Sequence, residues 1–422
     1  MYKYLRYLYI LVSLLVFTSC QKSIPLNTQT AQSQNTDSCI PPIESFVYFV
    51  GADSTQRPVE EYTPLPQPGG GDMQIPPNWL VAADLPENYN LLFARNVNEV
   101  TELWFSEYIT DPQDDAWGKY FRNFQIYNTE TKELQLISAE VEGSGIFAED
   151  LFLSPNGSIW AQNNLDLIHS IPGGAKYSIL SWFNDISGQF EFVDEAQSIP
   201  FSSKKNKDDD GKWVSAVMDK AGRLWFVVPE DAIYSYDPAT KKTKKWVEIS
   251  ELYSYAPIAP SDGNIYFLVL SEESRMPTTS DIRISRFSPK TGQVEFVFMR
   301  LDPWPVFTSL LMDSRGRLWA GGLAYRDVYG RVYQFERSPI FLTNPLDKTG
   351  FDYRWETPEI LTESSDGRLW FRSSNGLAWL DLDEQKWCWV STSQSKVIED
   401  PQHTLWMTAY GKLYKQSIVP AK

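Results

Sequence analysis

Histidine and cysteine are scarce in this chain. Its 422 residues contain two histidines, His169 and His403, and three cysteines. A catalytic triad or a histidine-based metal centre needs such side chains brought together from several places in the sequence. With so few of them, the sequence favours a non-catalytic protein with no cofactor and no bound metal over an enzyme.

Basic residues are also in the minority. Lys and Arg total 38 against 54 Asp and Glu, which gives a formal net charge of −16. Binding to nucleic acid and charge-driven docking on anionic lipid both need clustered Lys and Arg, so neither is expected. The acidic balance favours solubility and leaves a cationic ligand or a metal open.

The N-terminus carries only a short hydrophobic run. Lys3 and Arg6 precede eleven mostly apolar residues, Tyr7 to Phe17. A helix needs roughly 20 residues to cross a bilayer, so we interpret residues 1–19 as a cleaved signal peptide. The end of this segment resembles a bacterial lipobox, although Phe17 stands where leucine is commoner.

The lipobox resemblance implies that Cys20 carries lipid, palmitate included, and holds an extracytoplasmic body at the cell membrane or outer membrane. An ordinary signal-peptidase site beside a chance cysteine is the alternative. Residues 20–42 are predicted to be a flexible tether, because they are rich in Gln, Ser, Thr and Asn. Residues 58–77, rich in Pro and Gly, are predicted to be a long loop. Cys39 and Cys388 then remain, either as one disulfide or as two thiols.

A short motif recurs along the rest of the chain. Five of its seven copies place a glycine three residues before a Trp or Tyr, as in Asp219-Lys220-Ala221-Gly222-Arg223-Leu224-Trp225. Gly accepts positive φ and Asp bonds nearby backbone, so the motif fits a tight turn that opens a strand. The seven aromatic residues are predicted to lie in the core: Trp104, Trp160, Trp225, Tyr266, Trp319, Trp370 and Trp406.

The spacing of the motif predicts the fold. The seven aromatic residues lie 36 to 65 residues apart, and repeats near 40 to 50 residues with four short strands each are typical of β-propellers. We therefore expect an all-β, seven-bladed propeller over residues 43–419. Two complete units are expected to have strands at 213–219, 223–228, 232–236 and 243–247, and at 359–363, 368–372, 376–380 and 386–390.

The last unit has only three predicted strands, near 395–399, 404–408 and 412–416. Residues 44–50 form a good strand with no unit of their own. We predict that this N-terminal strand pairs with 412–416 as the outer strand of the last blade, which closes the ring and leaves no open edge there.

The repeat Asp-x-x-Gly-x-Leu-Trp, followed by Gly-Leu and an aromatic residue, resembles those of two-component regulator propellers and is similar to those of streptogramin-lyase-like propellers. The resemblance covers roughly residues 90–416. Streptogramin lyases as a family are linked to a catalytic histidine, a glutamate and magnesium on the central axis. This sequence shows no matching histidine constellation, so none of those roles is assigned to its residues.

Binding residues are expected in a funnel at one face of the propeller, where loops entering the innermost strands meet loops joining second to third strands. The candidates are Trp304, Arg354, Trp355 and Glu149, with Asp150 and the acidic segment 111–117 nearby. Trp and Arg are common at binding hot spots, although each residue also fits an ordinary loop or packing role.

The remaining polar motifs are weaker. His403 is expected in a turn on the face opposite the funnel, so it is not expected to meet His169. Residues 206–211 have the spacing of a calcium loop, but Val214 and Val217 occupy positions where oxygen ligands belong. A solvated loop is therefore expected there.

Three functions stay open. The sequence favours a lipid-anchored extracytoplasmic propeller that acts as a non-catalytic binding or scaffolding module for a protein, small-molecule or glycan ligand. A lyase- or lactonase-type propeller enzyme that uses axial carboxylates, with or without a divalent metal, is one alternative. An extracellular sensor for a signalling partner is the other alternative. All three stay open because a propeller fold does not by itself fix function.

Overall fold

The computed structural model divides the chain into two units, Met1–Thr36 and Asp37–Lys422. The structure describes residues 39–40, 43–49, 75, 78–86, 89–109, 121–163, 178–196, 198–199, 214–249, 253–270, 282–299, 309–321, 324–337, 359–373, 376–381, 386–391 and 396–420. In this described part, no helix is long and apolar enough to span a bilayer.

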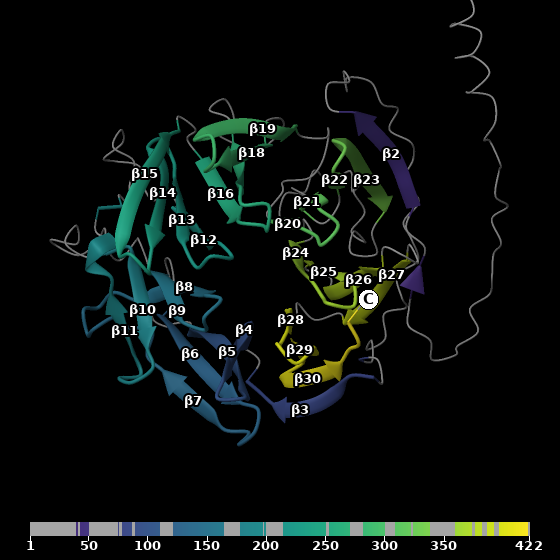
Figure 1. The fold of residues 1–422 in the computed structure, drawn as a ribbon. Helices are drawn as coiled ribbons and strands as arrows, with labels where there is room; N and C mark the ends of the chain where they lie inside the picture. The colour runs from purple at the N-terminus through teal and green to yellow at the C-terminus, as the bar shows by residue number, and fades with distance from the viewer. Residues whose placement is uncertain are drawn as a thin grey trace, which may run out of the picture. The chain divides into compact units, whose positions relative to one another are not determined.

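The described strands form seven antiparallel sheets, which are the blades of a propeller (Figure 1). Blades one to four consist of β4 (Tyr89–Val97), β5 (Val100–Ile109), β6 (Phe121–Asn128) and β7 (Leu134–Ile137); β8 (Ala148–Leu153), β9 (Ile159–Asn163), β10 (Leu180–Asn184) and β11 (Gln189–Phe192); β12 (Ser215–Met218), β13 (Leu224–Val228), β14 (Ala232–Asp237) and β15 (Lys242–Glu248); and β16 (Tyr253–Ile258), β17 (Ile265–Leu270), β18 (Ile282–Ser288) and β19 (Gln293–Met299).

Blades five to seven follow in the same order. They consist of β20 (Leu310–Met312), β21 (Leu318–Ala320), β22 (Ala324–Arg326) and β23 (Arg331–Arg337); β24 (Glu359–Glu363), β25 (Arg368–Ser373), β26 (Gly376–Asp381) and β27 (Lys386–Ser391); and β28 (Val397–Glu399), β29 (Thr404–Ala409), β30 (Lys412–Ser417) and β3 (Leu80–Asp84). A short 3-10 helix, η2 (Asp194–Ala196), follows blade two.

The first strand of each blade lies at the centre of the ring. These inner strands contact one another in a closed series, β4 with β8, β8 with β12, and so on through β28, which contacts β4 again. Each blade is an antiparallel meander running outward from this inner strand. The predicted all-β, seven-bladed propeller is therefore confirmed, and the strands predicted for blades three and six differ from the observed ones by at most two residues at either end.

A strand from the N-terminal part closes the ring, as predicted, but its identity was predicted wrongly. The outer strand of blade seven is β3, which pairs with β30 through Val81 opposite Tyr414 and Asp84 opposite Lys412. The predicted strand, residues 44–50, corresponds to β2 (Ile43–Phe49), which instead pairs with β23 as a fifth strand of blade five. A second short strand, β1 (Cys39–Ile40), extends blade six in the same way by pairing with β27.

Proximity to blade one explains why β3 closes the ring. Only residues 85–88 separate β3 from β4, so the chain passes directly from the edge of blade seven into the innermost strand of blade one. The sequence Leu80-Val81-Ala82-Ala83-Asp84 has weak β-propensity, whereas β2 is rich in aromatic and β-branched residues. Strand propensity therefore identified a strand but not its partner.

In three of the seven blades, an aspartate at the first position organises the repeated turn. In blades three, five and seven this residue is Asp219, Asp313 or Asp400. Its Oδ1 accepts the backbone N–H groups two and four residues later at 2.9–3.0 Å. Its Oδ2 accepts the indole N–H of the Trp six residues later at 2.8 Å. The aspartate therefore fixes the turn and the orientation of the Trp together.

The motif Trp residues fill the space between neighbouring blades. Trp225 lies 5.9 Å from Phe287 of blade four, and Trp319 lies 5.9 Å from Phe371 of blade six, measured between ring centroids. The predicted core position is confirmed for all but one of the seven motif aromatics, which are buried. Trp160 is only half-buried, and it packs at the edge of the cluster formed by blades two and three.

Candidate functional site

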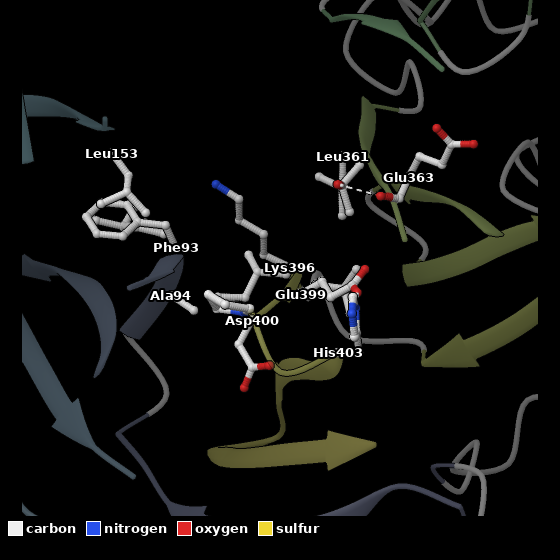
Figure 2. Close-up of a pocket in the computed structure, with 14 residues that line it drawn as sticks. Phe93, Ala94, Leu153, Leu361, Glu363, Lys396, Glu399, Asp400 and His403 are labelled. Carbon is white, nitrogen blue, oxygen red and sulfur yellow. Dashed lines mark hydrogen bonds and ion pairs between the residues drawn. The ribbon is translucent and has the colours of Figure 1, made fainter. Parts of the chain in front are cut away.

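The inner strands of blades one, two, six and seven border a pocket of about 630 Å³ (Figure 2). Its lining comes from β4, from the end of β8, from the end of β24, and from β28 with the turn that follows it. The pocket therefore lies along the ring of inner strands. Its shape depends on four blades that are far apart in the sequence.

One wall of the pocket is apolar. Leu92 and Phe93 come from β4, Leu153 from β8 and Leu361 from β24. The Phe93 ring stacks on the buried Trp104, with 5.8 Å between ring centroids and 21° between ring planes. This stacking holds Phe93 in place at the pocket surface and links the wall to the core between blades one and two.

Among the described residues that line the pocket, Lys396 is the charged group without a hydrogen-bond or ion-pair partner. It directly precedes β28, and its side chain extends between Phe93 and Leu153 on one side and Leu361 on the other (Figure 2). Within the described ranges, its ammonium group makes no hydrogen bond or ion pair. Burial lowers the pKa of Lys396 because it disfavours the charged form, and the nearby Arg372 lowers it further. Glu359 and Asp150 act against this and raise the pKa.

The carboxylates at the other end of the pocket already accept hydrogen bonds from neighbouring blades. Glu363 accepts hydrogen bonds from the Ser314 N–H at 2.6 Å and from the Ser314 hydroxyl at 2.7 Å, which joins blade six to blade five. Glu399 accepts a hydrogen bond from the Ser365 N–H at 2.6 Å, which joins blade seven to blade six. These acidic side chains therefore hold the ring together.

His403 belongs to the same arrangement. Its Nδ1 lies 2.7 Å from Glu399 Oε1 and 3.1 Å from the Ser365 hydroxyl. It occupies the turn between β28 and β29, as predicted, with a left-handed φ of 58°. The residue thus contributes to the junction of blades six and seven.

The predicted binding residues are only partly covered by the structure. Glu149 lies on the inner strand β8, at a register shift between Ala148 and Asp150, and is half-buried. Asp150, its neighbour, is close enough to Lys396 to influence its pKa. Trp304, Arg354 and Trp355 lie outside the described residues, as do His169 and the segments 111–117 and 206–211.

Lys396 was not identified from the sequence. The expectation that loops entering the inner strands would carry the site does include its position, since it directly precedes β28. A single Lys after a Ser- and Gln-rich segment has no distinguishing sequence pattern. Among the residues that the structure describes, no group of three or more His, Cys, Asp or Glu side chains could hold a metal ion.

Cys388 is buried on β27 and is disulfide-bonded. The strand register places Cys39 of β1 directly opposite it. Cross-strand neighbours have the short backbone separation that a disulfide requires.

Comparison with known proteins gives no family assignment. No protein-family model matches the chain, and no curated protein matches it. Among solved structures, it is similar to the extracellular domain of a putative hybrid two-component system from B. thetaiotaomicron, with 13% identity over 83% of this chain and 44% of that chain and a TM-score of 0.49.

Two further solved structures are similar. One is PorZ, a surface component of the type-IX secretion system of Porphyromonas gingivalis, with 13% identity over 80% of this chain and 48% of that chain and a TM-score of 0.47. The other is an auxiliary nutrient binding protein from Bacteroides thetaiotaomicron, with 10% identity over 77% and 68% and a TM-score of 0.39. The chain spans about half the length of the first two solved chains.

Proposed function

We propose that this chain is a non-catalytic binding module that takes its ligand in the axial pocket of the propeller. The observation that carries the proposal is the unmatched ammonium group of Lys396 in a pocket with an apolar wall. A partly buried charge without a counter-ion costs free energy, and a ligand that supplies the counter-charge recovers it. A pocket of about 630 Å³ is also of the size that binds small molecules.

The contacts in the pocket support binding over scaffolding alone. Glu363 and Glu399 are used to join neighbouring blades, whereas Lys396 joins no blade to another within the described residues. A charged side chain that does not stabilise the ring but points into its pocket fits a role in ligand recognition.

We also propose how the propeller is attached. Residues 1–19 would be removed as a signal peptide, Cys20 would carry lipid, and residues 20–42 would form the tether. A disulfide between Cys39 and Cys388 would fasten the end of that tether to blade six, consistent with the register of β1 and β27. Replacing Cys20 with Ser should then release the protein from the membrane fraction, and peptide mapping without reductant should recover Cys39 linked to Cys388.

The pocket can be tested with a variant that fills it. The mature chain is screened by thermal shift against small molecules, glycans and peptides, where a ligand at a hundred times its Kd adds roughly 2.7 kcal/mol of stability. Leu153→Trp places an indole in the pocket, and Val419→Trp is the control because Val419 is 84% exposed. Loss of the ligand response in Leu153→Trp alone would support the proposal. An unchanged response in Leu153→Trp would place the binding site elsewhere and refute it.

A further inference from the structure

We propose that the axial pocket recognises a small organic monocarboxylate with an apolar body, whose carboxylate pairs with Lys396. This inference rests on the proposed binding function and specifies its ligand class. It follows from three features of the pocket: one unmatched cation, engaged acidic groups around it, and an apolar wall beside it.

The charges around the pocket select a monoanion. Glu363, Glu399 and the turn aspartate Asp400 line it, and each already accepts hydrogen bonds from the protein. Glu359 pairs with Arg372, so the positive charge of Arg372, which also acts on Lys396, is already neutralised. Among the lining residues that the structure describes, Lys396 supplies the only ammonium group, and a single negative charge on the ligand matches it. A dianion such as a phosphate monoester would face these carboxylates with an uncompensated charge.

The apolar wall selects the rest of the ligand. Phe93, Leu153 and Leu361 flank the Lys396 side chain (Figure 2). An aryl or alkyl group attached to the carboxylate would cover these side chains, and the apolar surface so removed from water would favour binding. A fully hydroxylated ligand would gain less from this wall.

Binding of this kind has a defined pH dependence. The carboxylate requires protonated Lys396, and burial lowers the pKa of that group below its usual range. A bound carboxylate favours the charged amine and raises its pKa again. Affinity should therefore fall as the pH rises, starting at a lower pH than an ordinary lysine would give. Within the described part of the chain, the other charged groups facing this region are Glu359 and Glu363 of β24, Arg372 of β25, Asp150 of β8, and Glu399, Asp400 and His403 of blade seven.

The test compares probes that share one body and differ in charge. Phenylacetate, 2-phenylethanol, 2-phenylethylamine and phenyl phosphate are titrated calorimetrically into the mature chain. Phenylacetate should bind at least tenfold more tightly than the other three. Lys396→Met should weaken phenylacetate at least tenfold and leave 2-phenylethanol unchanged, whereas Lys396→Arg should retain most of the phenylacetate affinity. Lys412→Met is the matched control, because Lys412 forms an exposed ion pair with Asp84 at 2.6 Å.

Each remaining outcome has a distinct meaning. Tighter binding of the amine or the phosphate would overturn the inference, as would phenylacetate binding that survives Lys396→Met, and so would the absence of binding by every probe. None of these results would by itself refute the binding function. That proposal fails on a different result, a ligand response that persists when Leu153→Trp fills the pocket.

Discussion

Buried polar groups differ between two regions of the molecule. Those of several motif tryptophans between the blades have hydrogen-bond partners, whereas the ammonium group in the central pocket has none among the described residues. Between the blades, the indole N–H groups of Trp225, Trp319 and Trp406 each donate to a turn aspartate at 2.8 Å. At the axis, the Lys396 ammonium group has no such partner among the described residues. The turn aspartates therefore contribute to stability, whereas for Lys396 we expect a cost to stability.

Blade one shows that the matched pattern depends on the motif. Its copy of the repeat is looser and has no aspartate at the turn position. The indole N–H of Trp104 is buried there without a hydrogen-bond partner in the described structure. The guanidinium of Arg95 lies over the Trp104 ring instead, 5.4 Å from its centroid, and pairs with Glu102 at 2.8 Å. Packing and an ion pair thus replace the turn hydrogen bond.

The largest expected effect tests the packing between blades. Trp225→Ala should lower the free energy of unfolding by about 3–5 kcal/mol, because it removes a fully buried ring that packs on Trp246 and Phe287. Urea denaturation measures this change. Val419→Ala, at an exposed position, should change the free energy by less than about 0.5 kcal/mol. A cost below about 1 kcal/mol for Trp225→Ala would show that this layer is not the main source of stability.

An effect of intermediate size is expected from the first residue of the turn, which is Asp313 in blade five and Ser364 in blade six. Asp313→Ala removes the acceptor for two backbone N–H groups, an indole and the Arg317 guanidinium, and should cost about 2–3 kcal/mol. Ser364→Ala removes a hydroxyl that accepts only the Trp370 indole at 3.0 Å among side-chain donors, and should cost about 1 kcal/mol. Equal costs, measured by urea denaturation, would contradict the role assigned to the aspartate.

A smaller effect of opposite sign is expected at the axis. Lys396→Met should raise the free energy of unfolding by about 1 kcal/mol near neutral pH, because it removes a partly buried charge. The folded-state pKa of Lys396 is lowered, so the unfolded chain binds the proton more tightly. The destabilisation is full below the folded-state pKa and fades as the pH rises towards the unfolded value. Thermal melts between pH 6 and 10 should show the gain shrinking, and a loss of stability at pH 7 would mean that Lys396 supports the fold.

The smallest effect concerns the charge of a turn aspartate. Asp327 of blade five accepts the backbone N–H groups of Tyr329 and Arg331 and the Arg331 guanidinium. Burial tends to raise the pKa of Asp327, but the hydrogen bonds outweigh it, so the pKa is lowered. The stabilisation from this carboxylate is present above its unfolded pKa and is lost as the pH falls through its folded pKa. Asp327→Asn should therefore cost up to about 1 kcal/mol at pH 7 and less at pH 2.5, as measured by denaturant unfolding at both values.

Local structure was largely predictable from the sequence. The turn motif around Asp219 and Trp225 predicted the strands of its blade because glycine at positive φ, aspartate bonding and the buried Trp all act within seven residues. The prediction that an N-terminal strand closes the ring was correct, but it named the wrong strand. Two strands, β2 and β3, could each complete a blade, and propensity does not distinguish among distant partners.

The sequence alone therefore determined the repeating unit, the number of blades and the core position of most motif aromatics. These properties depend on residues close together in the chain. Tertiary structure decided that β3 pairs with β30, where Asp84 and Lys412 meet across 328 residues. It also decided that Lys396 lines a pocket with Phe93, Leu153 and Leu361 and makes no ion pair with any described residue. The burial and charges around a side chain depend on blades that only the closed ring brings together.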